Sequence, residues 1–273
     1  MLRRLMDAHA KDFDKKFSVI YDNTGREYNE TLDFGHEVET RWGVPIIWLE
    51  YCRVNGEHSV KVVNYETAAR RDDKRPGPFD EMNEWAGTLP NVRGRGCSGQ
   101  LKVRTTKRYL KTLGLESWTS YVGIRADESD RAGEIMCQCP KYITPQFPLI
   151  DARVTHKMVD DWWDTQPFKL NLPNFKGNCD LCFLKAKWKR LAIMRTEPEA
   201  AQWWIGWERR KEAEMKAAGK TTNGARWIDG VTYEGLLAES QHPELDFSEQ
   251  DIPCSCAVGG YREADDEGSN EKS

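Results

Sequence analysis

Two apolar stretches, FSVIY at 17–21 and VPIIWLEYC at 44–52, decide the fold class. Both are rich in β-branched and aromatic residues, which favour strands, and the second is apolar throughout its first half, as a buried parallel strand should be. Between them, residues 30–43 carry apolar side chains at helical spacing, and this pattern ends at Gly43. A strand, a helix and a second strand in this order predict an α/β fold whose sheet is mostly parallel and flanked by helices.

The same periodicities extend outward from this segment. They predict a first helix over 1–15, a third strand over 59–63, a short helix around 79–86, a basic helix over 98–113, a strand over 120–126, and helices over 155–165, 184–196 and 197–217. Residues 134–150 and 166–183 are predicted to be irregular. We expect three parts: an α/β core over 1–150, a helical cysteine-containing subdomain over 151–217, and a polar, partly disordered tail over 218–273.

Composition limits the class of protein. The 273 residues are 39% hydrophobic and 31% charged, which predicts a soluble globular protein. No run approaches 18 apolar residues, so we expect no membrane span, and the charged first 17 residues lack the pattern of a secretory signal. We therefore expect a cytoplasmic protein. A net charge of -4 argues against a general nucleic-acid coat.

The cysteines are more informative by spacing than by number. Cys179 and Cys182 are three residues apart in a predicted loop, a spacing that lets two thiolates bind one metal ion or cluster. Cys97 lies at a predicted helix start among basic residues, and it is a third candidate ligand. The alternative is that several cysteines are small buried apolar residues. The identity of a fourth ligand stays open, with two C-x-C pairs in the chain: Cys137 and Cys139, Cys254 and Cys256.

A polar turn follows the first predicted strand. Asp22, Asn23, Thr24 and Gly25 stand at its carboxyl end, where open α/β sheets bind ligands. The first two side chains suit hydrogen bonds to a sugar or base, and the glycine permits close approach of the backbone. An ordinary Asn-Gly-type turn is the equal alternative.

A second polar segment, GIRADESDR at 123–131, also follows a predicted strand. Arg125 and Arg131 suit a fork that binds phosphate or sulfate oxygens, with Asp127 or Glu128 orienting them. A surface turn with local ion pairs is the alternative.

A basic stretch lies between these two segments. Residues 93–111 contain seven lysines and arginines and no acid, and like charges at helical i,i+4 spacing repel one another. The stretch therefore predicts an anionic partner: a polyphosphate, a nucleic acid or an acidic surface. A merely solvated helix face is the alternative.

These motifs in order resemble the phosphoadenosine phosphosulfate (PAPS) reductase family, most closely its phage-borne and bacterial branch within the PP-loop, adenine-nucleotide alpha-hydrolase-like superfamily. The resemblance covers about residues 1–208. It implies a Rossmann-like nucleotide-binding core over residues 1–150, adenine nucleotide or sulfonucleotide binding at the strand ends, and sulfonyl or adenylyl transfer chemistry in sulfur metabolism. It also implies a 4Fe–4S cluster held by cysteines, with zinc as the alternative metal.

The resemblance assigns roles residue by residue. Asp22, Asn23, Thr24 and Gly25 match the nucleotide motif, Gly123, Arg125 and Arg131 match the substrate-contacting segment, and Cys97, Cys179 and Cys182 match the cluster cysteines. We place Lys102 with the cofactor-binding residues, and Arg125 and Arg131 as the catalytic pair.

The chain also departs from the family pattern. The family's first strand and its phosphate-binding S-G-G-x-x-S loop would precede residue 1, which accounts for a chain that opens with a helix. The family's adjacent cysteine pair is reduced to Cys97, and the C-terminal catalytic-cysteine motif is missing, so strict sulfonucleotide reduction is not expected. Two alternatives stay open: a zinc-stabilised module that binds nucleic acid through residues 93–111, and an inactive truncated family member.

Overall fold

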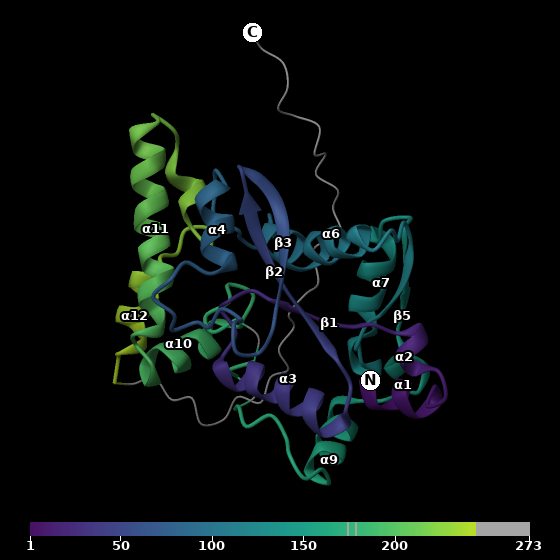
Figure 1. Ribbon diagram of the computed structural model, residues 1–273. Helices are drawn as coiled ribbons and strands as arrows, with labels where there is room; N and C mark the ends of the chain where they lie inside the picture. Colours follow the sequence, from purple (N-terminus) through teal and green to yellow (C-terminus); the bar gives the residue numbers. More distant parts are fainter. Residues whose placement is uncertain (174, 178, 244–273) are drawn as a thin grey trace. The chain divides into compact units, whose positions relative to one another are not determined.

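The computed structural model describes residues 1–243, apart from 174 and 178 (Figure 1). These residues form two compact units: Met1–Phe17 with Leu110–Pro167, and residues 18–109 with 168–243. Each unit combines two stretches far apart in sequence, so its boundaries differ from those predicted at 150 and 217. Cys254, Cys256 and the predicted disordered end of the tail lie outside the described residues.

The larger unit contains a three-stranded sheet of order β1-β2-β3. β1 (Val19–Asn23) runs parallel to β2 (Ile46–Val54), and α3 (Asn29–Trp42) connects them, which confirms the predicted strand–helix–strand unit. The third strand, β3 (Glu57–Val63), instead pairs antiparallel with β2. Asn55 and Gly56 have φ angles of 52° and 85°, and an Asn-Gly pair in this conformation makes a tight hairpin turn. The sheet is therefore mixed.

The basic stretch does not form one continuous helix as predicted. It consists of α5 (Gly96–Ser98), a π-helical turn η1 (Gly99–Val103) and α6 (Arg104–Thr112). The hydroxyl of Thr105 donates to the carbonyl of Gln100 at 2.9 Å, five residues earlier. π-turns inside helices are frequent at functional sites.

The helix α4 (Pro78–Trp85) precedes the basic stretch. It begins at a proline and packs against β2.

The carboxyl-terminal helices form the largest core. They are α10 (Lys187–Thr196), α11 (Ala200–Ala217), the 3-10 turn η3 (Thr222–Ala225) and α12 (Tyr233–Ser240). Trp204, Trp227 and Tyr233 are at most 1% exposed, and Trp204 lies 4.7 Å from Trp227 and 5.3 Å from Tyr233 between ring centres. The prediction of a polar tail from residue 218 is therefore wrong for the described part. Apolar side chains are sparse in the sequence of this segment, but in the folded protein Trp227, Tyr233 and Leu236 are buried in one core.

Glu208 fixes this segment to α11. It is 2% exposed and accepts hydrogen bonds from the backbone amides of Tyr233 at 2.8 Å and Trp227 at 3.5 Å. Burial raises the pKa of Glu208 to about 7, although the two amides lower it. In the unfolded chain the same carboxyl loses its proton near pH 4.5.

Glu208 should therefore make stability fall as pH rises. Between about pH 4.5 and 7 the folded state keeps a proton that the unfolded state releases, so the contribution present at low pH is lost as pH rises through 7. We expect Glu208→Gln to remove up to about 1.4 kcal/mol per pH unit of this slope. Urea unfolding at pH 5, 6 and 7 measures it. An unchanged slope in the variant would contradict the assignment.

The smaller unit is also α/β. Its strands β4 (Trp118–Tyr121) and β5 (Ile143–Gln146) are parallel. Its helices are α1 (Leu2–Ala8), α2 (Phe13–Lys16), η2 (Ala126–Glu128), α7 (Ser129–Gln138), α8 (Pro148–Asp151) and α9 (His156–Asp164). The first predicted helix is thus broken, and the predicted irregular segment 134–150 contains a strand and parts of two helices.

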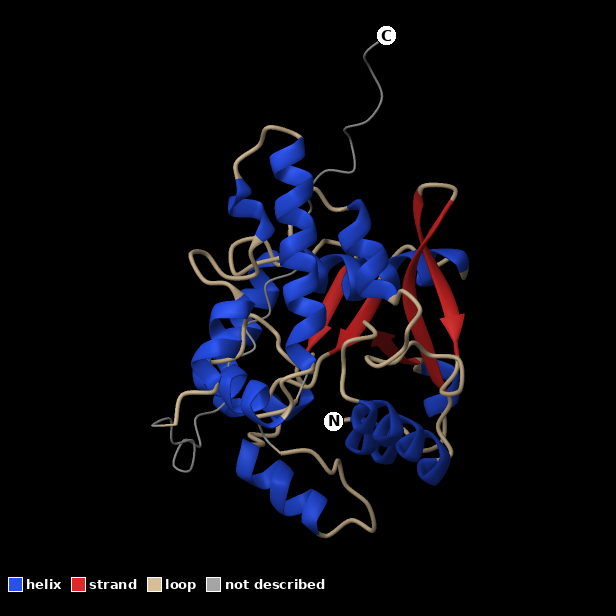
Figure 2. Ribbon diagram, turned by 90° about the vertical axis from the view of Figure 1, so that its left-hand side faces the viewer, coloured by secondary structure: helices blue, strands red, loops and turns tan. Residues whose placement is uncertain are grey.

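The predicted class, a mixed α/β protein with mostly parallel strands, is confirmed, because two of the three strand pairs are parallel (Figure 2). None of the helices in residues 1–243 has the length and apolar character needed to cross a membrane.

Candidate functional site

The C-x-x-C loop lies directly beside the turn that follows β1. Cys179 forms an isolated antiparallel bridge with Glu27, and the amide of Asp180 donates to the carbonyl of Arg26 at 3.0 Å. The amide of Cys182 donates to the carbonyl of Cys179 at 3.4 Å, which closes a turn. A loop predicted as irregular thus presents its two thiols at the carboxyl end of a parallel strand.

A buried ion pair holds this loop in place. Arg26 and Asp180 are 6% and 0% exposed and form a salt bridge. The other carboxylate oxygen of Asp180 accepts hydrogen bonds from Nε1 of Trp204 and the amide of Leu181, both at 2.8 Å. The guanidinium of Arg26 lies 4.5 Å from the ring centre of Trp203. The loop is therefore anchored to both β1 and α11.

Cys97 joins the other two cysteines from α5. Burial first, and then the nearby Cys182, raises the pKa of the Cys97 thiol to about 12. Burial, Glu27 and Cys182 likewise raise the pKa of the Cys179 thiol well above its usual range. Cys97 and Cys179 both pack against the hydrophobic core that includes Leu181 and Phe183, the chain neighbours of Cys182, so the three cysteines lie in the same region of the larger unit.

Lys102 supplies the positive charge at this site. It lies on the π-turn η1, its Nζ is 3.8 Å from Oε1 of Glu27, and its side chain is 45% exposed. Desolvation lowers its pKa, but Glu27, Cys179, Asp22 and Cys97 raise it by more. Lys102 is therefore a charged group that pairs with Glu27 and remains accessible to solvent.

Asp22 stands on the other side of Lys102. Its carboxylate accepts hydrogen bonds from the hydroxyl of Thr106 at 2.9 and 3.0 Å. Burial raises the pKa of Asp22 to about 7, and Glu27 adds to the shift, while Thr106 and Lys102 oppose it. The carboxyl can thus gain or lose a proton near neutral pH.

The remaining residues of the 22–25 motif build the turn itself. The amide group of Asn23 donates to Glu50 at 2.6 Å and to the carbonyl of Ala69 at 2.9 Å, and its oxygen accepts from the amide of Gly25 at 3.1 Å. Gly25 has φ +72°, and a Cβ there would lie 3.0 Å from Pro78. Both residues shape the strand end.

Thr24 connects that turn to the cysteines. Its hydroxyl lies 2.7 Å from Oε2 of Glu27 and 3.6 Å from Sγ of Cys179. Burial first, and then Glu27 and Cys179, raises the pKa of the Tyr21 hydroxyl. That hydroxyl is buried and finds no hydrogen-bond partner among the described residues. An unpaired buried hydroxyl has a donor to offer to a bound group.

The chemistry of these donors suits a thiophilic metal or an iron–sulfur cluster. Cys97, Cys179 and Cys182 are free, partly buried thiols, and thiolates are the ligands that zinc and iron–sulfur clusters prefer. The raised pKa values of Cys97 and Cys179 favour protonated thiols until a cation compensates the thiolate charge. Among the described residues, no group of three or more His, Cys, Asp or Glu side chains lies in an arrangement that could hold a metal ion.

The third predicted motif lies in the smaller unit. Glu128 forms ion pairs with both Arg125, at 3.1 Å, and Arg131. Asp127 adds a contact to Arg125 at 3.3 Å, and Gly123 precedes them after β4. Both arginines therefore pair with the carboxylate of Glu128, and these contacts are the local ion pairs of the alternative interpretation.

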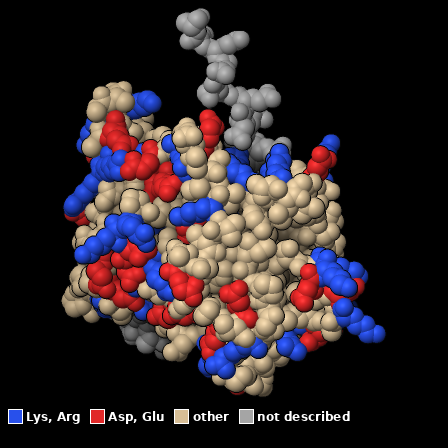
Figure 3. Space-filling view, viewed as in Figure 1, with Lys and Arg blue, Asp and Glu red and all other residues tan. Residues whose placement is uncertain are grey.

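The basic stretch has acidic partners of its own. Arg93 pairs with Asp229 at 2.9 Å and Lys102 with Glu27, so two of its charges are directed at carboxylates of the protein. On the face shown in Figure 3, the basic side chains near α11 are interspersed with acidic ones. Exposed ion pairs that involve α11 include Arg209–Glu234 and Arg210–Glu84.

Three residues of the site were not predicted from the sequence. Tyr21 and Asp180 each adjoin a predicted motif residue and Glu27 lies two residues after Gly25, but each has the sequence context of an ordinary strand or loop residue. Only the position of Asp180 inside the C-x-x-C pair was a usable signal. The ion pairs of Glu27 with Lys102 and of Asp180 with Arg26 join distant parts of the chain.

No protein-family model and no solved structure matches the chain. An Escherichia phage lambda protein named "Uncharacterized nin region protein ORF290" is 30% identical over 185 residues, which are 64% of this chain and 59% of that protein. An Escherichia phage 186 protein named "Uncharacterized 37.8 kDa protein in gpa 5'region" is 26% identical over 145 residues, 44% of this chain and 43% of that protein. The matched residues therefore span less than two thirds of the length of either relative. Both relatives are phage proteins.

Proposed function

We propose that this protein is a PAPS reductase-like protein with a Rossmann-like core, which binds an adenine nucleotide or sulfonucleotide and supports sulfonyl or adenylyl transfer. The observation that supports the proposal is that Cys97 and Cys179 pack on one core beside the turn that follows β1, where Thr24 contacts Cys179 and Lys102 pairs with Glu27. In open α/β sheets this edge is the usual ligand-binding edge.

The three thiolates would hold a 4Fe–4S cluster, and its iron without a cysteine ligand would position or polarise the substrate, or carry sulfur. Lys102 would compensate the thiolate charge and contact an anionic group of the ligand. Thr24 and Glu27 orient Cys179, and the Tyr21 hydroxyl has a donor to offer.

Asp22 would contribute a proton-transfer group or a hydrogen bond to a ribose. Its raised pKa, near 7, suits a carboxyl that exchanges a proton at neutral pH. Arg125 and Arg131, which share Glu128, would serve as an oxyanion-binding pair for phosphate or sulfate.

Anaerobic purification followed by iron, sulfide and zinc analysis tests the proposal. We expect about four iron and four sulfide per chain if a 4Fe–4S cluster is bound, with a brown absorbance. Cys179→Ala and Cys97→Ala should each lose most of it. Cys52→Ser is the matched control, because Cys52 is a half-buried cysteine on β2 outside the cluster.

The alternatives give different results. One zinc per chain without sulfide would support the zinc-stabilised module, and salt-sensitive binding of the zinc-loaded protein to single-stranded nucleic acid would then be measured. Iron content equal in wild type and Cys179→Ala would contradict ligation by this cysteine.

Equilibrium dialysis with adenosine 5′-phosphosulfate tests nucleotide binding separately. Lys102→Met should weaken the binding of this nucleotide about tenfold or more.

A further inference from the structure

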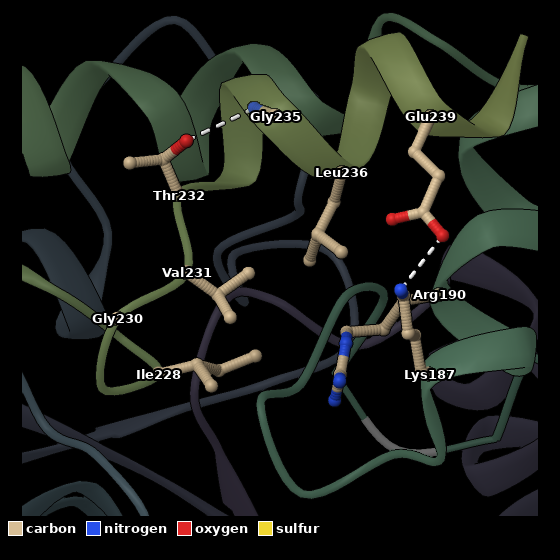
Figure 4. A pocket seen from close by; sticks show the side chains of 9 residues that line it. All are labelled: Lys187, Arg190, Ile228, Gly230, Val231, Thr232, Gly235, Leu236 and Glu239. Carbon is tan, nitrogen blue, oxygen red and sulfur yellow. Dashed lines mark hydrogen bonds and ion pairs between the residues drawn. The ribbon is translucent and has the colours of Figure 1, made fainter.

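A cavity of about 390 Å³ lies between α10, the turn at 228–231 and α12 (Figure 4). This volume falls within the range of ordinary small-molecule sites, about 300–1,000 Å³. Ile228, Val231 and Leu236 give it apolar walls. None of its lining residues belongs to the cysteine site, and no motif found in the sequence includes it.

Arg190 is the buried polar residue of the cavity. It is 7% exposed, and its Nη1 donates to the carbonyl of Phe183 at 2.8 Å and to that of Lys185. Its Nε is buried and finds no hydrogen-bond partner among the described residues. Figure 4 shows the side chain reaching from α10 into the space bounded by Ile228, Val231 and Leu236. An unpaired buried donor of this kind is destabilising unless a ligand oxygen accepts from it.

The charges around the cavity specify the ligand further. Lys187 and Glu239 form a 2.7 Å ion pair, and their side chains are 56% and 40% exposed, so they lie toward solvent. Together with Arg190 they give the lining one net positive charge. A monoanion balances this charge, whereas a phosphate dianion would exceed it and meet Glu239.

We propose that this cavity binds a small monocarboxylate with a short aliphatic body. The carboxylate accepts a hydrogen bond from Nε of Arg190, and the hydrocarbon contacts Ile228, Val231 and Leu236. The burial of Arg190 strengthens this bond, because the guanidinium has little water to lose when the ligand arrives.

A ligand-observed NMR titration with isovalerate tests the proposal, and isovaleramide serves as the neutral control of the same shape. We expect isovalerate to bind in the millimolar range and the amide at least about tenfold more weakly, because an ionised acceptor makes the stronger hydrogen bond. Equal binding of acid and amide would overturn the carboxylate assignment. Inorganic phosphate that competes with isovalerate at equal concentration would overturn the preference for a monoanion.

Two variants locate the binding. Arg190 also holds the loop after Cys182, so its removal endangers the fold and we leave it unchanged. Val231→Phe fills the cavity and should abolish isovalerate binding while circular dichroism stays native. Glu239→Gln removes the negative charge and should tighten binding roughly two- to fivefold. Unchanged binding in Val231→Phe would place the ligand elsewhere and overturn the proposal.

Discussion

Asp180→Ala should be among the most destabilising substitutions in this protein. The carboxylate is fully buried, pairs with Arg26, and accepts from Trp204 and Leu181. Its removal leaves the guanidinium of Arg26 buried without its counter-charge, which costs about 3–5 kcal/mol. Urea unfolding followed by tryptophan fluorescence measures the change in the free energy of unfolding.

Two further variants separate the causes. Asp180→Asn keeps an oxygen that can accept from Trp204 but removes the charge, so it should lose less stability than the alanine variant. Glu234→Ala breaks an ion pair with Arg209 whose side chains are 66% and 63% exposed, and it should cost no more than about 1 kcal/mol. If Asp180→Ala and Glu234→Ala lowered the free energy of unfolding by the same amount, the anchoring role of Asp180 would be refuted.

Trp227→Ala should have an effect of similar size. Trp227 is 0% exposed, its Nε1 donates to the carbonyl of Trp204 at 3.0 Å, and its ring contacts Phe79 and Phe183. Truncating a buried tryptophan removes a large contact area and leaves a cavity, at about 3–5 kcal/mol. Thermal unfolding should show a fall in Tm of about 2–4 °C for each kcal/mol lost.

The control is Trp85→Ala, since Trp85 is 51% exposed on α4. It should cost about 1 kcal/mol or less. If Trp227→Ala and Trp85→Ala lowered the free energy of unfolding equally, residues 222–240 would not belong to the core. That result would restore the polar-tail interpretation of this segment.

Local signals predicted much of the secondary structure. The first two strands and the helix between them followed from apolar run length and helical spacing, which depend on neighbours within a few residues. The third strand was predicted, but its antiparallel pairing with β2 was not, although Asn55 and Gly56 signal a hairpin turn. The π-turn that carries Lys102 was missed because its wider hydrogen bonding leaves no distinct pattern in the residues.

Some features of the candidate site were likewise predicted from the sequence, and others were found only in the structure. Spacing identified Cys179 and Cys182 as a pair, and Cys97 was selected by its position at a predicted helix start among basic residues. The sequence by itself thus determined the candidate side chains and the strand that precedes the polar turn. Only the tertiary structure decided that Thr24 contacts Cys179, that Lys102 pairs with Glu27, that Asp180 anchors the loop, and that Arg190 lines a cavity. Such contacts join residues far apart in the chain, and their strength comes from burial, which no local pattern specifies.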